Sequence, residues 1–205
     1  MTQYGFYFDA TRCTGCHTCE AACRDYHDLG LDFTFRHVYE IEGGGWNQAS
    51  DGTWSTDSYT YYVSTSCQHC DNPACTHVCP TGAMHKGDDG IVSVDVKKCI
   101  GCGYCELACP YGNPKVDREK GHSTKCDGCA SRLAEGKSPI CVEACTMRAL
   151  QFGPADKMAK LGERAALAPL PDPANTTPNL YVKACEHAKP SGSTDCVVAN
   201  TAEVK

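Results

Sequence analysis

The chain has 205 residues and a formal net charge of −6, a length that suits one or two compact domains. The acidic balance excludes a nucleic-acid binder that works through basic charge, and a hydrophobic content of 41 % argues against wholesale disorder. The apolar runs are far shorter than the roughly 20 residues of a membrane span, and the N-terminal segment lacks the features of a signal peptide. We therefore expect a soluble chain that reaches any membrane or exported location through a partner.

The first third of the chain predicts a short strand at 6–9 and a helix that begins near Glu20. The stretch from about 31 to 66 then interrupts the pattern of cysteines. Its glycine run at 43–45 predicts a turn, flanked by one or two strands that form an insertion. Its aromatic residues include Trp46, Trp54, Tyr59 and Tyr61. We expect them to pack over a cysteine-rich site rather than to form a binding platform.

The second half predicts a hairpin turn at 88–90, next to a strand at 91–95. One helix is predicted at about 156–167, after which several prolines prevent helix continuation. We expect the tail to be an extended arm over its own body or a partner, or to be loosely ordered.

Eighteen cysteines make up about 9 % of the residues, a level reached mainly by disulfide scaffolds and metal-rich chains. Sixteen of them fall into four quartets. These are Cys13, Cys16, Cys19 and Cys23; Cys67, Cys70, Cys75 and Cys79; Cys99, Cys102, Cys105 and Cys109; and Cys126, Cys129, Cys141 and Cys145. The first and third quartets follow C-x2-C-x2-C-x3-C, the iron–sulfur run of bacterial ferredoxins, whose fourth cysteine serves the neighbouring cluster.

Internal repeats indicate which quartets are partners. The first and third match at every cysteine and at the Gly, Glu and Ala between them, and the second and fourth also resemble each other. The chain therefore contains two copies of a two-motif unit. The second and third quartets form an inner unit, and the first and fourth form an outer unit that is split around it.

Exchange of the fourth cysteine within each unit gives four ligand sets. They are Cys13, Cys16, Cys19 with Cys145 (first set); Cys126, Cys129, Cys141 with Cys23 (second set); Cys67, Cys70, Cys75 with Cys109 (third set); and Cys99, Cys102, Cys105 with Cys79 (fourth set). Uncrossed sets, in which each quartet keeps its own fourth cysteine, have the same spacing and stay open as an alternative.

Other interpretations of the cysteines fit the spacing less well. Disulfide scaffolds are mostly shorter and do not repeat such tight triplets, and structural zinc usually takes two pairs that are a dozen or more residues apart. His17 completes a C-x2-C-H haem-attachment motif, but the repeat partner has Gly103 there, so we expect a loop residue beside a cluster. Cys185 and Cys196 lie outside the quartets, either free or paired with each other.

Sixteen thiolates without a substrate base, a nucleotide loop or an open metal position describe an electron relay rather than an enzyme. Basic residues next to ligands are candidates for raising the reduction potential of a cluster, with solvated surface positions as the alternative. These residues are Arg12, Lys97, Lys98 and Lys125.

Four quartets in this order and spacing resemble the four-cluster ferredoxin-type subunits of molybdopterin oxidoreductase complexes. Within that group the chain is most similar to the electron-transfer subunits of anaerobic dimethyl sulfoxide reductases. The segments that carry this resemblance are Gln3-Tyr4-Gly5-Phe6, 67–75, 83–86, 121–129 and 168–171. In the nitrate reductase branch a tryptophan replaces the residue that corresponds to Cys102 and that cluster loses an iron, so Cys102 implies four 4Fe–4S clusters here.

The resemblance implies an α+β fold of two tandem bacterial-ferredoxin-like, two-cluster units, one inserted in the other, plus an irregular C-terminal arm. The corresponding ranges are 4–33 (outer unit, first half), 34–58 (insertion), 59–89 and 90–119 (inner motifs), 120–153 (outer unit, second half) and 154–205 (arm).

The same resemblance implies a non-catalytic subunit with two partners. One is a molybdopterin catalytic subunit that reduces dimethyl sulfoxide or related S- and N-oxides, and the other is a membrane anchor that oxidises quinol. Polysulfide, tetrathionate, nitrite or formate complexes are alternatives for the substrate, and a zinc-binding interaction module is the alternative class. The implied location is peripheral on the inner membrane, on the periplasmic face by co-export, with the cytoplasmic face as the alternative.

Overall fold

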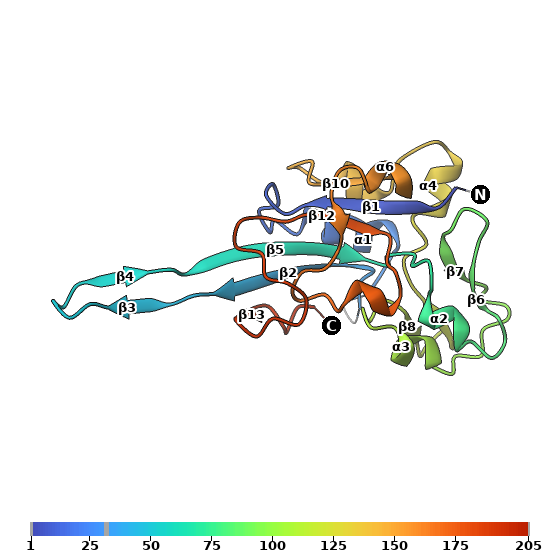
Figure 1. Cartoon of the computed structure of the whole chain (residues 1–205). Coiled ribbons are helices and arrows are strands. Elements are labelled where there is room, and N and C mark those ends of the chain that lie inside the picture. Colours follow the sequence, from blue (N-terminus) through green and yellow to red (C-terminus); the bar gives the residue numbers. More distant parts are fainter. Residues whose placement is uncertain (1, 31–32, 205) are drawn as a thin grey trace.

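The computed structural model describes residues 2–30 and 33–204, and its centre is a four-stranded sheet (Figure 1). The strand order is β10 (Leu150–Pro154), β1 (Tyr4–Asp9), β12 (Leu180–Lys183) and β11 (Glu163–Arg164). Strand β1 runs antiparallel to β10 and parallel to β12. The predicted strand at 6–9 is thus confirmed as part of β1. The C-terminal segment supplies two other strands of this sheet, β12 and β11.

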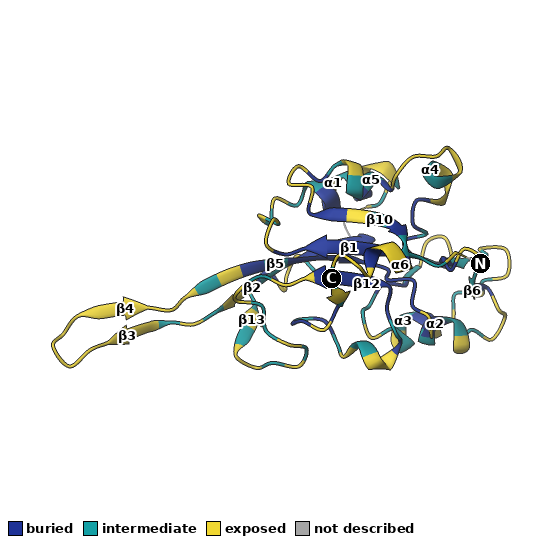
Figure 2. Cartoon of the chain, turned by 45° about the horizontal axis from the view of Figure 1, so that its top comes forward, coloured by how far each residue is buried: buried dark blue, intermediate teal, exposed yellow. Residues whose placement is uncertain are grey.

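A second, antiparallel sheet packs against the first and forms the core with it (Figure 2). Its strands are β13 (Cys196–Val198), β2 (Arg36–Gly43) and β5 (Tyr59–Ser66). The buried apolar residues between the sheets include Phe6, Phe8, Val38, Ile41, Val63, Leu150, Leu167, Leu180 and Val182. Alternation along β1 turns Phe6 and Phe8 inward, and alternation along β5 turns Tyr61 and Val63 inward, which accounts for the sheet-on-sheet packing.

Beyond the core, the β2–β5 ribbon continues as a narrow arm of β3 (Trp46–Gln48) and β4 (Trp54–Thr56) (Figure 1). The chain reverses at 49–53, so the turn predicted at 43–45 is wrong. Gly44, with φ +74°, instead approaches the Asp57 carbonyl at a kink between β2 and β3. Trp46 is 68 % exposed and Trp54 59 % exposed, because the arm extends past the sheets that would cover them. The expected packing over a cysteine-rich site is therefore wrong for both tryptophans.

The two cysteine units repeat one local arrangement of paired helices and a paired strand. The outer unit contains α1 (Thr18–Tyr26) packed against α5 (Ile140–Glu143), beside the β1–β10 pair. The inner unit contains α2 (Ala74–His77) packed against α3 (Tyr104–Ala108), beside β6 (Met84–Lys86) and β7 (Val92–Val94). The predicted strand at 91–95 and the hairpin turn at 88–90 are both confirmed by β6 and β7, and the mixed α+β fold class is confirmed as well.

Short elements complete the chain: β8 (Lys115–Asp117), β9 (His122–Thr124), α4 (Ala130–Ala134), α6 (Ala155–Met158) and a 3-10 turn at Pro173–Asn175. The helix predicted at about 156–167 is wrong, because α6 ends at Met158. Gly162 then lies against the backbone of Val182, where an added Cβ would stand 2.6 Å away, and the chain enters β11. Among the described residues, no helix has the length and apolar character needed to cross a membrane.

Candidate metal centres

The first set of cysteines surrounds a cavity beside β1. Cys13, Cys16 and Cys19 line it from the loop that enters α1, and Cys145, just after α5, lines its other side. Burial, opposed by a backbone hydrogen bond from Gly15 and aided by the nearby thiols of the set, raises the pKa of Cys13 to about 11. Cys16 is exposed, and hydrogen bonds from Thr18 lower its pKa to about 7. Three buried or partly buried thiols and one at the surface therefore face a common space.

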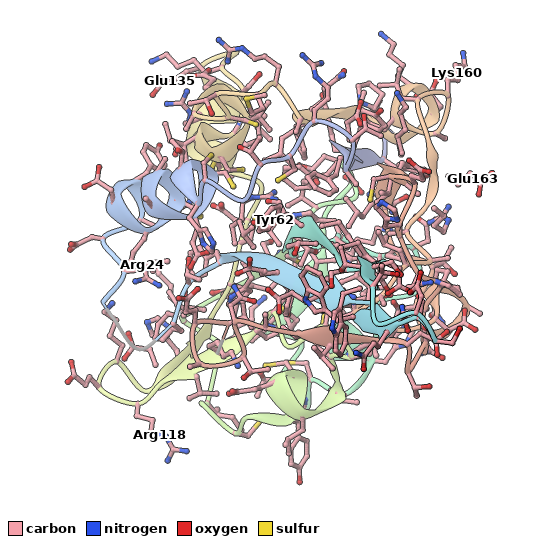
Figure 3. All side chains as sticks on the ribbon, turned by 90° about the vertical axis from the view of Figure 1, so that its left-hand side faces the viewer. Arg24, Tyr62, Arg118, Glu135, Lys160 and Glu163 are labelled. Atoms are coloured by element: carbon pink, nitrogen blue, oxygen red, sulfur yellow. The ribbon has the colours of Figure 1, made fainter. Side chains whose placement is uncertain are left out.

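An aromatic residue of β5 covers this loop. Gly15 has φ +66°, and a Cβ there would lie 2.3 Å from the ring of Tyr62 on β5. Figure 3 labels Tyr62 near the centre of this side of the molecule, whereas the labelled Arg118, Glu135 and Lys160 point outward at its edges. Glycine is thus required at position 15 both by the backbone and by the close ring.

The second set gathers around the buried interior of the outer unit. Burial raises the pKa of Cys23, and the neighbouring thiolates of Cys126, Cys141 and Cys129 raise it further. The imidazole Nε2 of His27 lies 3.5 Å from Cys129 Sγ. The structure thus groups Cys23 with the fourth quartet rather than with its own.

Helix geometry explains why one quartet serves two sites. Cys19 and Cys23 are four residues apart on α1, so they lie on the same face about one turn apart. Cys19 joins the first set and Cys23 the second, and the α1–α5 contact brings Cys141 and Cys145 to the same two sites.

The third set lies in the inner unit. Burial raises the pKa of Cys75 to about 12, with the nearby Cys67, Cys109 and Cys70 thiolates adding to it. Cys67 differs: burial alone would raise its pKa, but the Lys125 ammonium, together with a hydrogen bond from the backbone of His69, lowers it to about 5. Cys109 therefore lies beside thiols of the second quartet, although in the sequence it is part of the third quartet.

The fourth set lines a second cavity at the outer end of the inner unit. Its cysteines are Cys79, Cys99, Cys102 and Cys105. Cys102 is exposed, as Cys16 is in the first set, whereas Cys105 is buried. Both repeats thus have one set with a ligand at the surface.

The sixteen thiols lie in four groups of four, and each group combines thiols from two quartets. Thiolates are the soft ligands that iron–sulfur clusters take. Among the described residues, no group of three or more His, Cys, Asp or Glu side chains is arranged to hold a single metal ion. The first and fourth sets instead line cavities, so the donor chemistry and the enclosed space suit a larger group.

Comparison with known proteins identifies the family. Residues 58–155 match the model of a 4Fe-4S dicluster domain. The B subunit of the anaerobic dimethyl sulfoxide reductase of Haemophilus influenzae is 56 % identical over 205 residues, the whole of both proteins. The corresponding B subunit of Escherichia coli K12 is 55 % identical over 204 residues, 99 % of each protein. This protein belongs to the family of dimethyl sulfoxide reductase B subunits, which are iron–sulfur proteins. The B subunit of the polysulfide reductase of Wolinella succinogenes is more distant, at 37 % identity over 185 residues, covering 88 % of this chain and 93 % of that one.

Family membership confirms that this is an iron–sulfur electron-transfer subunit, non-catalytic by itself, and that 4Fe–4S clusters are its cofactors. Backbone amides are directed at several of the grouped thiols. The N–H groups of Met84, Ser123 and Ala149 point to Cys79, Cys99 and Cys145 at 3.2–3.3 Å. Such donors stabilise negative charge on sulfur. Sequence spacing does not reveal them, because they depend on turns that only the folded chain defines.

Buried cations are the other electrostatic feature of these sites. Of the four basic residues predicted to raise a potential, only Lys125 is buried, at 4 % exposure. Arg12, Lys97 and Lys98 are exposed, so the solvated alternative holds for them. Sequence reasoning missed Arg36, which is 1 % exposed on β2. Arg36 lies two residues before the buried Val38, so both side chains lie on the same face of the strand. This is the one hint that the sequence offers.

Arg36 lies between the first and second sets. Its guanidinium donates to Ser64 Oγ at 3.1 Å and Ser66 Oγ at 2.9 Å, and stacks over the Phe6 ring at 4.9 Å. Burial alone would lower its pKa, but nearby thiolates, led by Cys141 and Cys19, raise it overall. A fully charged arginine is therefore held among the ligands of two sites.

The remaining candidates lie outside the four groups. His17 is the N-cap residue just before α1, with φ 56°, and its Nδ1 lies 3.1 Å from Glu20 Oε2, in agreement with a loop residue beside a site. Cys185 and Cys196 are free and partly buried near Tyr61. They join none of the four sets.

Proposed function

We propose that this chain relays electrons through four 4Fe–4S clusters, one in each of the four cysteine sets. The observation that carries the proposal is the crossed grouping, in which every set holds four thiols drawn from both quartets of its unit. A bound cluster supplies one-electron chemistry, and the protein tunes its potential through burial, N–H donors and charge. The chain's own residues hold the clusters, exclude water and fix their spacing.

We further propose that the sixteen ligands belong to two units. The inner unit comprises the motifs at 59–89 and 90–119, and the outer unit comprises 4–33 and 120–153, with the insertion at 34–58 and the arm at 154–205. The repeated pairing of helices and strands in both halves supports this division.

The proposed path runs from the first set through the second and third to the fourth. Helix α1 carries ligands of the first and second sets. Cys67 of the third set and Cys126 of the second pack in one buried cluster, and α2 with its flank carries ligands of the third and fourth. Exposed Cys16 and Cys102 mark the two ends. Such an arrangement suits a relay that exchanges electrons at both ends with other proteins.

The proposed partners are a molybdopterin catalytic subunit that reduces dimethyl sulfoxide or related S- and N-oxides, and an integral membrane anchor that oxidises quinol. Identity to the B subunits of dimethyl sulfoxide reductases is 55–56 %, against 37 % for that of polysulfide reductase, which favours this substrate class. We place the complex on the inner membrane, with this subunit on the periplasmic face. Labelling of intact cells with a membrane-impermeant reagent tests that face.

Metal analysis of the anaerobically purified chain tests the cofactor count. We expect about sixteen irons and as much labile sulfide per chain, for four cubanes. About four zincs without labile sulfide would establish the zinc module instead.

A ligand substitution tests the crossed grouping. Cys23→Ser removes a ligand of the second set. Only the cluster of the second set is therefore expected to lose or to change its electron paramagnetic resonance (EPR) signal. The matched Cys185→Ser variant should keep all four signals. If Cys23→Ser altered the cluster of the first set, the uncrossed assignment would be correct.

A further inference from the structure

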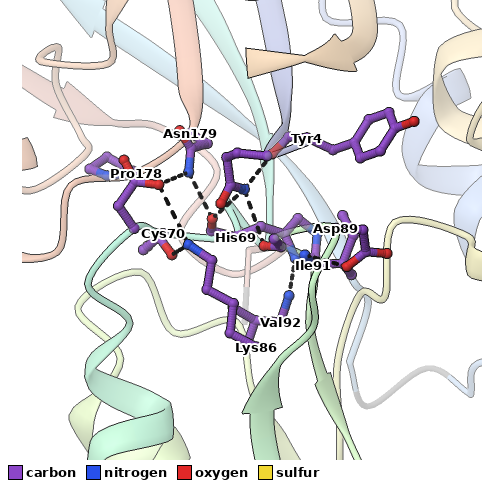
Figure 4. Close-up of polar contacts among 12 residues, drawn as sticks. Tyr4, His69, Cys70, Lys86, Asp89, Ile91, Val92, Pro178 and Asn179 are labelled. Carbon is purple, nitrogen blue, oxygen red and sulfur yellow. Dashed lines mark hydrogen bonds and ion pairs between the residues drawn. The ribbon is translucent and has the colours of Figure 1, made fainter. Parts of the chain in front are cut away.

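His69 lies fully buried where the two cysteine units meet. It stands between Cys67 and Cys70 with φ 44°, a backbone conformation that is unfavourable for a residue other than glycine. Its carbonyl oxygen accepts hydrogen bonds from Gln3 Nε2 at 3.3 Å and from Asn179 Nδ2 at 2.9 Å (Figure 4). Because Gln3 precedes β1 and Asn179 precedes β12, the central sheet fixes this loop of the inner unit.

The imidazole ring of His69 has one engaged nitrogen and one without a partner. Nδ1 accepts a hydrogen bond from the N–H of Val92 at 3.0 Å, so the hydrogen of the neutral ring lies on Nε2. Lys125 Nζ donates to the Val92 carbonyl and thereby fixes the other side of that residue. Within residues 2–30 and 33–204, Nε2 makes no hydrogen bond of good geometry, and the second thiol that interacts with the ring, besides Cys67, is Cys126 of the second set. A buried donor without a well-placed acceptor is unfavourable, which points to a sulfur acceptor at that set.

The ring stands between ligands of two different sets. Its Nδ1 is 3.9 Å from Cys67 Sγ of the third set. On the other side, a Cβ added to Gly128 would lie 3.9 Å from Nε2, which places this nitrogen at the loop of the second set. Cys126 of that loop packs in the same buried cluster as Cys67. No other described imidazole contacts ligands of both the second and third sets in this way.

We propose that His69 couples the two units: its Nε2–H donates a hydrogen bond to a sulfur atom at the second set, and its ring forms the connection for electron transfer between the second and third sets. This inference rests on the proposed function. One electron leaves the reduced group in one set and enters the oxidised group in the other. No proton moves, because Nε2 keeps its hydrogen in both states. The donor stabilises the more negative, reduced state at the second set.

Three variants of the cluster-loaded chain test the proposal by EPR-monitored redox titration. His69→Leu removes the donor and His69→Gln keeps an amide donor. His187→Leu is the matched control, since His187 is exposed and stacks on Tyr59 away from the four sets. In His69→Leu we expect the electron-sharing equilibrium between the second and third sets to shift about tenfold toward the third, which is about 59 mV for one electron. His69→Gln should recover part of the shift, and His187→Leu should show none.

Iron analysis separates failure of this inference from failure of the proposed function. If wild type and His69→Leu both hold about sixteen irons and their potentials agree, the coupling role is refuted and the relay stands. A wild-type chain without four clusters refutes the proposed function itself. Should both His69 variants lose a cluster, the wild-type protein labelled with ¹⁵N-histidine decides. A hyperfine coupling between a histidine nitrogen and the second-set cluster that is retained in His27→Gln supports the role, and its absence overturns it.

Discussion

Replacement of Arg36 by methionine is expected to lower the reduction potentials of the clusters in the first and second sets. The arginine is 1 % exposed, and its charge is surrounded by thiolates of both sets. Reduction adds negative charge to a cluster, so a nearby cation favours the reduced state. Methionine fills similar space without charge, which makes the change mainly electrostatic.

Two hydrogen-bond distances bound the size of the effect. Arg36 Nη1 is 3.1 Å from Ser64 Oγ, and Cys19 Sγ is 3.4 Å from the same oxygen, so nitrogen and sulfur are at most 6.5 Å apart. Coulomb's law with an effective dielectric constant of about 20 gives about 2.5 kcal/mol at that separation. This corresponds to about 110 mV for a one-electron couple. Because the added electron spreads over the whole cluster, a decrease of about 50–100 mV is expected.

Redox titration followed by EPR, on chains with equal iron content, measures this shift. Arg36→Lys is the matched variant, because it keeps the charge and loses only the planar double donation to Ser64 and Ser66. It should retain most of the wild-type potentials. Unchanged potentials in Arg36→Met would refute the electrostatic reasoning, and an equal decrease in both variants would assign the effect to the lost hydrogen bonds instead.

Three further outcomes concern stability. Burial, followed by Lys115 and Arg36, lowers the pKa of His37 to about 4. The same imidazole in the unfolded chain has a pKa of about 6.5, so as the pH falls the unfolded chain takes up the proton first. The contribution of His37 to the free energy of unfolding is therefore fully present above pH 6.5 and decreases toward pH 4. At pH 5 this contribution to the free energy of unfolding is smaller by about 2 kcal/mol. Denaturant unfolding of wild type and His37→Gln at pH 7 and pH 5 measures it, and this decrease is expected in wild type alone. Phe8→Ala should lower the free energy of unfolding by about 3–5 kcal/mol, since Phe8 is 0 % exposed. Trp46→Ser, on the exposed arm, should change it by less than about 0.5 kcal/mol in the same assay.

The sequence predicts the parts of this structure that repeat or follow a fixed spacing. The three-residue steps between cysteines and the short strand and turn signals beside them are local, so they indicate the sixteen candidate ligands, the strand at β1 and the β6–β7 hairpin. The fourth cysteine lies one helical turn beyond the third, which limits the ligand sets to two schemes. Only the tertiary contact of α1 with α5, and of α2 with α3, distinguishes the crossed scheme from the uncrossed one.

Features that depend on distant segments escape sequence reasoning. The segment at 156–167 is rich in helix-forming residues, but Gly162 must fit against Val182, so the chain extends there. In the insertion, the glycine run resembles a turn, yet the ribbon continues through a kink at Gly44 and reverses later. In both cases packing or strand pairing overrides a local preference.

The buried cations show why charge has to be considered with the cofactors included. Each oxidised cluster with its four thiolates carries about −2, so four proposed sites would add about −8 to the formal −6 of the chain. Such charge in a low-dielectric interior is unfavourable unless donors and cations surround it. The fold supplies Arg36 between the first and second sets and Lys125 between the second and third. Each cation lies where two sets approach, so it offsets repulsion between adjacent sites as well as charge within one. The feature that marks a junction between two of the proposed sites is therefore a basic residue that is buried without a carboxylate partner. A basic residue that is only adjacent to a cysteine in sequence does not mark one.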